Sequence, residues 1–288
     1  MPEALPLIQS LSDKSSGEST TLLLYGDSGV GKTWMCGTLG ERTLFCNIGN
    51  GIATLQSPLF SSRYPAAGKM LVVDIFEKAG KGGIITETTV LNGLTDILDH
   101  AFVSLLDRID NIVIDDLSAL SRAASIRGLE VNQATKKSQS MTTIKSEGVM
   151  IFAMQDFGAE MGVMKWFFAT YINLAKMHNK NLVITALPLR IFRKGEKASD
   201  PEILVSVMPA VTGKNTFALD FPGYFDDVWY MDVLGNPQGL QTRVQTRKDN
   251  VYVAKTRHNG VFNDKEINPD LGEMFGRIKK NVLLSKGK

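Results

Sequence analysis

The stretch "LLLYGDSGVGKTWMCGTLG", residues 22–40, decides the fold of this chain. A short apolar run ends at Gly26, and a run with helical character begins at Lys32, so the pattern predicts a strand, a loop and a helix. The loop matches G-x-x-x-x-G-K-[ST] in full and in the context that this pattern requires. Its residues are Gly26, Asp27, Ser28, Gly29, Val30, Gly31, Lys32 and Thr33. We expect them to form a phosphate-binding loop.

Each residue type in this loop has a physical reason. Glycines let successive backbone N–H groups turn inward around phosphate oxygens, and the start of the following helix adds the positive end of its dipole. Lys32 is expected to reach the β- and γ-phosphates, and the Thr33 hydroxyl to take one position on Mg²⁺. The loop therefore predicts ATP and Mg²⁺ as cofactors, with Lys32 also acting in catalysis.

A second motif, "NIVIDD" at residues 111–116, is an apolar strand that delivers two carboxylates to the edge of a sheet. Asp115 is predicted to hold the Mg²⁺, as the acidic strand of P-loop NTPases does. Asp116 has two interpretations of about equal weight. It either polarises the attacking water as a catalytic residue, or it caps a helix or faces solvent.

Composition limits the class of protein. The chain has 288 residues, of which 43% are hydrophobic, and this is enough for one large α/β domain. We expect a flexible, Ser-rich leader over residues 1–19 and a single domain over residues 20–288. The formal charge is only +2, but residues 241–288 carry 11 Lys or Arg against 5 Asp or Glu, so a polyanion is expected to prefer this end.

Localisation is predicted from what the sequence lacks. It shows no basic-then-apolar signal pattern and no apolar run of membrane-spanning length, and its two cysteines, Cys36 and Cys46, are not spaced for a metal site or a disulfide framework. We therefore expect a cytoplasmic protein with no membrane partner.

Apolar runs alternate with amphipathic runs up to about residue 203, which predicts a mostly parallel sheet covered by helices on both faces. Helices are expected at residues 90–106 and 158–181. Strands are expected at residues 20–25, 42–48, 69–76, 111–115 and 181–188. From residue 203 the pattern changes to short strands with turns, including "ILVSVMP" and "VYVAKTR", closed by a helix near residues 272–284. These strands are predicted to be antiparallel and to extend the same sheet.

A third motif, "VAKTRHNG" at residues 253–260, places Lys255 and Arg257 two residues apart. If this segment is a strand, both side chains point the same way. Two such cations can complete the active site of a neighbouring subunit as a finger. Without further support they would be assigned to a solvated strand face.

The order of these motifs carries a family resemblance. The K-x-R pair before a Gly turn resembles the trans-acting finger of DnaB-type helicases and related RecA-core proteins. The whole layout, over roughly residues 20–280, resembles the shortened RecA-like ATPases that phages encode for single-strand annealing and recombination, the Sak-type group. The resemblance implies a RecA-like P-loop fold, ATPase activity, head-to-tail self-association, single-stranded DNA as partner, and the cytoplasm of an infected bacterium as location.

The chain departs from this family at one position. The second strand of such proteins ends in an acid that activates water, and this chain has Asn47, Gly49 and Asn50 there. Either Asp116 substitutes for the missing acid, or hydrolysis is slow or absent.

RecA-like cores bind single strands through loops that follow the acidic strand and the next strand, and both corresponding segments here are basic. Cations together with an exposed aromatic ring are typical of binding without sequence readout, although each segment alone is also compatible with a solvated loop. The candidate DNA-binding residues are Arg127, Lys136, Lys137, Lys145, Arg190, Phe192, Arg193 and Lys194.

These observations favour an ATPase that assembles on single-stranded DNA. Two alternatives stay open: an annealing scaffold with structural ATP and little turnover, and a ring-shaped helicase or translocase. The sequence does not decide between filament and ring, because closure depends on a small rotation between subunits. A small-molecule kinase is the least favoured class, because no Arg-rich lid segment is evident.

Overall fold

The computed structural model describes residues 19–78, 88–134, 154–194, 201–211, 220–236 and 239–286. Its centre is an eight-stranded sheet with the order β10-β9-β8-β1-β5-β4-β2-β3. The strands of this sheet are β1 (Thr21–Gly26), β2 (Thr43–Asn47), β3 (Leu71–Asp74), β4 (Asn111–Asp115), β5 (Asn181–Ala186), β8 (Asp227–Asn236), β9 (Gly239–Gln245) and β10 (Lys265–Ile267).

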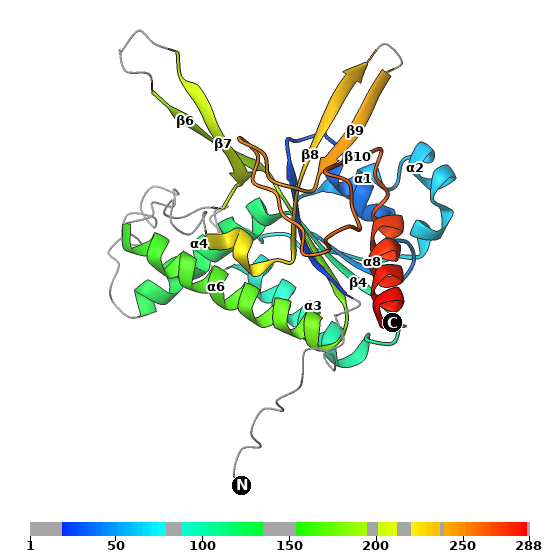
Figure 1. Ribbon diagram of the computed structural model, residues 1–288. Helices are drawn as coiled ribbons and strands as arrows, with labels where there is room; N and C mark the ends of the chain where they lie inside the picture. The colour runs from blue at the N-terminus through cyan, green and yellow to red at the C-terminus, as the bar shows by residue number, and fades with distance from the viewer. Residues whose placement is uncertain are drawn as a thin grey trace.

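Helices cover both faces of this sheet (Figure 1). The α-helices of the described residues are α1 (Lys32–Gly37), α2 (Pro58–Arg63), α3 (Thr89–Ser104), α4 (Leu117–Ala134), α6 (Met154–Met177) and α8 (Leu271–Lys286). Short 3₁₀ turns lie at η1 (Gly51–Thr54), η2 (Pro65–Lys69) and η4 (Phe221–Tyr224).

Alternation along the strands divides the interior into two apolar cores. On β1, Leu23 and Tyr25 face the core that packs against α3, α4 and α6, whereas Leu22 and Leu24 face the core that packs against α1 and α8. All four side chains have no exposed surface. Strands that are apolar on both faces are typical of a sheet covered by helices on both sides. This covering explains why the strands appear in the sequence as continuous apolar runs.

The predicted α/β class is confirmed. Strands β1 to β5 pair in parallel, and β9 and β10 add antiparallel pairs at the C-terminal side. The two strands β8 and β9 pair as an antiparallel hairpin. One detail differs, because β8 itself runs parallel to β1.

The segment "ILVSVMP" does not extend the main sheet as predicted. It forms β7 (Ile203–Pro209), which pairs with β6 (Pro188–Arg193) in a separate two-stranded antiparallel sheet. We refer to β6 and β7 together as the arm. The arm projects beyond the helical layers, on the same side as the β8–β9 hairpin (Figure 1). Its outer residues are largely solvent-accessible, including Phe192 and Ile203, unlike those of the doubly covered main sheet.

The segment at residues 251–257 was also predicted to be a strand, and this was wrong. It forms only isolated bridges, between Tyr252 and Val207 of β7 and between Lys255 and Val228 of β8. Because the segment crosses from the arm to the main sheet, it does not pair continuously with a strand of either sheet. Tyr25 of β1 fixes this crossing, because its hydroxyl lies within hydrogen-bond distance of the carbonyl oxygens of both Val207 (3.0 Å) and Val253 (2.8 Å).

No helix within the described ranges is both long enough and apolar enough to span a bilayer.

Candidate functional site

The Gly-rich loop between β1 and α1 closes around a lysine. Gly29 and Gly31 have φ angles of +82° and +99°, a backbone conformation that residues with a Cβ adopt only at an energetic cost. This backbone path lets the Lys32 ammonium donate to the carbonyls of Gly26 and Asp27, at 2.8 Å each. Burial lowers the pKa of Lys32, although the nearby carboxylates of Asp115 and Asp116 oppose the shift. An anion at this loop would therefore meet a cation that water screens poorly.

The carboxylate of Asp115 lies beside the loop. Strand β5 separates β1 from β4, and the three strands end at the same edge of the sheet. Thr33 Oγ1 donates to Asp115 Oδ2 at 2.7 Å, and Thr185 Oγ1 of β5 donates to Asp115 Oδ1. Burial raises the pKa of Asp115, against the effect of these two hydrogen bonds. Thr185 was missed in the sequence, although a polar residue within the apolar run "NLVITA" was a usable signal.

The arrangement of Thr33 and Asp115 fits a divalent cation. Both supply hard oxygen atoms, which Mg²⁺ prefers. Gly51 lies directly over them, because a Cβ at this position would approach Asp115 Oδ2 to 2.6 Å and Thr33 Oγ1 to 2.7 Å. A side chain here would fill the space beside the two oxygens. A bound Mg²⁺ would itself stabilise the ionised form of Asp115.

Asp116 lines the same cavity, and its carboxylate also caps a helix. Asp116 Oδ1 accepts a hydrogen bond from the Ala119 N–H (2.9 Å) in the first turn of α4. The capping role considered for this residue is therefore present in the structure. The cavity has a volume of about 400 Å³. Its lining includes residues 28, 29, 31–34, 49–51, 54, 115, 116 and 187.

The end of β2 carries an amide where an acid was missing from the sequence. Asn47 is buried, and its Nδ2 donates to Asp74 Oδ1 of β3 at 2.5 Å. Its Oδ1 accepts from the Gly51 N–H at 3.1 Å. The Ile48 and Gly49 N–H groups donate to the Asp115 carbonyl at 2.7 and 2.8 Å. Asn47 thus positions the segment that covers the cavity.

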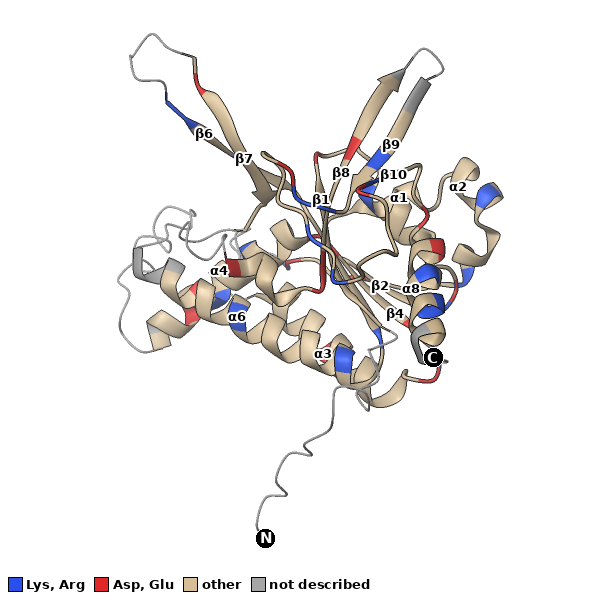
Figure 2. Ribbon diagram, in the orientation of Figure 1, with Lys and Arg blue, Asp and Glu red and all other residues tan. Residues whose placement is uncertain are grey.

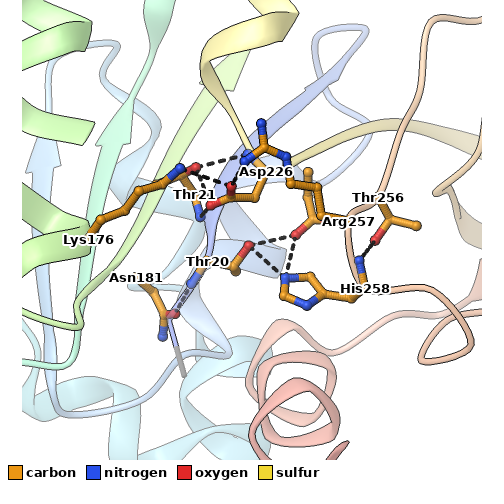
Figure 3. Close-up of polar contacts among 9 residues, drawn as sticks. Thr20, Thr21, Lys176, Asn181, Asp226, Thr256, Arg257 and His258 are labelled. Carbon is orange, nitrogen blue, oxygen red and sulfur yellow. Dashed lines mark hydrogen bonds and ion pairs between the residues drawn. The ribbon is translucent and has the colours of Figure 1, made fainter. Parts of the chain in front are cut away.

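The predicted finger residues lie at the opposite edge of the sheet, where β1 and β8 begin. Figure 3 shows Arg257 there, and Lys255 forms a bridge with Val228 near the start of β8. Arg257 Nη1 is 2.7 Å from Asp226 Oδ1, and Lys176 Nζ of α6 is 3.0 Å from the same atom. The Thr21 N–H and hydroxyl donate to Asp226 Oδ2. We refer to Thr21, Lys176, Asp226 and Arg257 as the Asp226 cluster. The local sequence had shown no carboxylate for Arg257, so both Asp226 and Lys176 were missed.

Lys255 lies beside this cluster. Burial lowers its pKa, and the positive charge of Arg257 lowers it further. The neighbouring His258 Nε2 lies 3.3 Å from Asp227 Oδ2, a carboxylate with no solvent exposure that also accepts from the Thr20 hydroxyl. The edge therefore gathers three cations, Lys176, Lys255 and Arg257, around two carboxylates. The Arg257 side chain keeps 58% of its surface exposed.

The predicted DNA-binding residues divide between two elements. Arg127 was expected in a loop, but it lies on helix α4 and pairs with Glu130 (2.7 Å). Arg190, Phe192 and Arg193 lie on β6 of the arm, and Lys194 follows immediately. The basic residues of the described chain, those of β6 among them, are blue in Figure 2. Arg190 is 2.6 Å from Asp27 of the Gly-rich loop. Lys136, Lys137 and Lys145 fall outside the residues that the structure describes.

A Gly-rich loop that encloses a lysine, together with an acidic strand that is separated from β1 by one intervening strand, defines a P-loop nucleotide-binding protein. A family model described as "AAA domain" matches residues 18–258. The chain therefore belongs to this family of AAA-type P-loop ATPase domains.

Two solved structures show remote similarity to this chain. A KaiC-like protein from the hyperthermophilic archaeon Pyrococcus horikoshii OT3 is 14% identical, with a TM-score of 0.41 over 87% of this chain and 89% of that one. The RadB recombinase is 10% identical, with a TM-score of 0.37 over 78% of this chain and 79% of the other. No curated protein is detectably similar in sequence.

Proposed function

We propose that this chain is a RecA-like ATPase that binds Mg·ATP in the loop at residues 26–33 and assembles head to tail on single-stranded DNA. The observation that carries the proposal is the cradle itself: Lys32 is enclosed by the loop, and Thr33 is hydrogen-bonded to Asp115. In this assignment Lys32 binds the β- and γ-phosphates, and Thr33 and Asp115 hold Mg²⁺. The bound Mg²⁺ would neutralise charge on the phosphates.

Water activation is assigned to Asp116. Its carboxylate lines the cavity, and no acid ends β2, where Asn47 is engaged by Asp74 and Gly51. One oxygen of Asp116 accepts from Ala119, and a carboxylate has further lone pairs for a water.

Head-to-tail assembly is supported by the positions of the two edges. The cradle lies at the carboxyl ends of the parallel strands, and the three cations of the other edge lie where these strands begin. Within one subunit they cannot meet. In a head-to-tail contact the cations of one subunit can face the phosphates of the next, with Lys255 and Arg257 stabilising charge that develops at the γ-phosphate.

DNA binding is assigned to the arm. Phe192 is half exposed and Arg193 and Lys194 follow it, so the strand offers a ring for stacking and cations for phosphates. The Arg190–Asp27 ion pair connects the base of the arm to the phosphate loop. Backbone hydrogen bonds connect Val207 of the arm to Val251 and Val253, which lead to Lys255 and Arg257. A chain of contacts therefore links the phosphate loop, the arm and the segment that carries the finger residues.

The wider setting follows from the resemblance of the motif order: recombination or strand annealing for a phage, in the cytoplasm of its host. A second candidate is an annealing scaffold in which ATP stabilises assembly and is hardly hydrolysed. The absence of an acid at the end of β2 favours it.

The test is ATP hydrolysis by the full chain with and without an unstructured oligonucleotide such as oligo-dT. The proposal expects hydrolysis that needs Mg²⁺ and increases with the DNA, and a Lys32→Ala chain purified in parallel gives the background. DNA binding without turnover would instead establish the scaffold, and binding of neither ligand would exclude both.

A further inference from the structure

One wall of the proposed nucleotide cavity carries an aromatic side chain, which neither phosphate nor Mg²⁺ needs for binding. Most of its lining consists of glycines, hydroxyl groups and carboxylates, all suited to charged ligands. Trp34, directly after Thr33, is the one aromatic side chain among the described residues that line the cavity. Leu187 is the other large apolar residue there, but its aliphatic side chain offers no ring on which a base could stack.

The indole of Trp34 is held in one orientation. Its ring meets the edge of Phe60 with a centroid distance of 4.9 Å and an interplanar angle of 86°. Tyr64 gives a second edge contact at 6.4 Å and 83°. Phe60 is fully buried on α2, and Gly37 permits its close approach to α1, because a Cβ at residue 37 would lie 2.4 Å from the Phe60 ring. The indole itself is only partly buried.

We propose that Trp34 is the base-binding residue of this site: its indole contacts the nucleobase of a nucleoside triphosphate whose phosphates occupy the loop at residues 26–33. The inference rests on the proposed nucleotide binding and adds the position of the base. An apolar ring at the edge of a polar cavity supplies what a nucleobase needs and a phosphate does not. A cavity of about 400 Å³ is within the usual size for a ligand of this kind.

Contact through an aromatic face also sets the ligand class. Stacking is tolerant of base identity, because every base has a π-face. We therefore expect ATP and GTP to bind with similar affinity, pyrimidine nucleotides more weakly because their rings are smaller, and inorganic triphosphate without any contribution from Trp34.

The experiment compares Trp34→Leu with Trp34→Phe in the full chain, with affinities for Mg·ATP and for Mg·tripolyphosphate measured by calorimetry. Trp34→Leu is expected to weaken ATP binding about tenfold and to leave tripolyphosphate binding unchanged. Trp34→Phe, which keeps a ring against Phe60, should restore most of the ATP affinity. Trp166→Leu is the matched control, since this tryptophan is 51% exposed on α6 and lines a different cavity.

Each other result is decisive. If Trp34→Leu weakens ATP and tripolyphosphate equally, Trp34 supports the fold of the loop and the inference is wrong. Unchanged ATP affinity in a folded Trp34→Leu chain would place the base elsewhere. If the wild-type chain binds Mg·ATP no more tightly than Mg·tripolyphosphate, only this inference fails. If the wild-type chain binds neither ligand, the proposed function itself is wrong.

Discussion

The two edges of the central sheet are built in different ways. At the carboxyl edge, eight consecutive residues form the phosphate loop, and Asp115, Asp116 and Thr185 join them from the ends of β4 and β5. At the amino edge, the Asp226 cluster joins residues from β1, α6, the start of β8 and the crossing segment, with Thr21 and Asp226 205 positions apart in sequence. The first edge is determined by local backbone geometry, the second by the packing of the whole domain. We expect substitutions at the carboxyl edge to affect chemistry, and those at the amino edge to affect assembly and stability as well.

The largest effect is expected for Lys32→Ala. The Lys32 ammonium donates two charge-assisted hydrogen bonds to carbonyls of the loop. Hydrogen bonds from the same ammonium to phosphate oxygens of ATP would contribute roughly 1.5–3 kcal/mol each. Affinity for Mg·ATP should fall by at least about a hundredfold and turnover should be lost, while circular dichroism shows the fold retained. Lys69→Ala, which removes an exposed lysine paired with Glu41, serves as the control. Wild-type affinity in a folded Lys32→Ala chain would contradict the assignment of the carboxyl edge.

Asp116→Asn should keep ATP binding and reduce turnover by about 10²- to 10⁴-fold, the usual range for loss of a general base. The amide oxygen can still accept from Ala119, so the helix cap is retained and the loss is chemical. Single-turnover hydrolysis with ATP binding measured in parallel separates the two effects. If the variant hydrolyses ATP at the wild-type rate, Asp116 is not the residue that activates the water.

What the sequence predicts, and what it does not, follows the same division between the two edges. The loop, the acidic strand and the layered sheet were predictable, because a contiguous motif and continuous apolar runs specify them locally. The Asp226 cluster was not, since nothing near Arg257 in sequence indicates Asp226 or Lys176. The strand predicted at residues 251–257 failed for a related reason: its β-prone residues bridge the arm and β8 separately, and only the tertiary structure determines this.

Charge removal on the arm is expected to have a moderate effect. Substituting Arg193 and Lys194 by glutamine should lower the log–log dependence of single-strand affinity on salt by about 1.4, at roughly 0.7 per phosphate contact. Arg63→Gln with Lys69→Gln removes the same charge from exposed positions on α2 and η2, outside the basic end, and should leave the slope unchanged. Equal slopes for the arm variant and the wild type would remove the arm from the DNA interface.

The smallest effect is expected on stability. Burial would raise the pKa of Asp226, but the hydrogen bonds from Lys176 and Thr21 outweigh it and the pKa is lowered. A depressed folded-state pKa adds stability that is present above the unfolded pKa of about 3.9 and is lost as pH falls through the folded value. Asp226→Asn should therefore lower the free energy of unfolding by roughly 1–3 kcal/mol at pH 7.

The difference between Asp226→Asn and the wild type should shrink when urea unfolding is repeated below about pH 4, near the unfolded pKa of a carboxyl group. A difference that does not depend on pH would mean that the charge of Asp226 is irrelevant to folding.

The central claim is that two subunits share one site, and mixing two inactive chains tests it most directly. Lys32→Ala keeps the finger but loses the cradle, whereas Arg257→Ala keeps the cradle but loses a finger that can contribute about 10³-fold or more in rate. Arg247→Ala, an exposed arginine paired with Asp264, should behave as the wild type does and controls for loss of charge. The account predicts that each of the first two chains alone is nearly inactive, and that ATP hydrolysis recovers in part when they are mixed, with a maximum at an intermediate ratio. No recovery at any ratio, in mixtures that light scattering shows to be assembled, would contradict the shared site and leave Arg257 as a structural partner of Asp226.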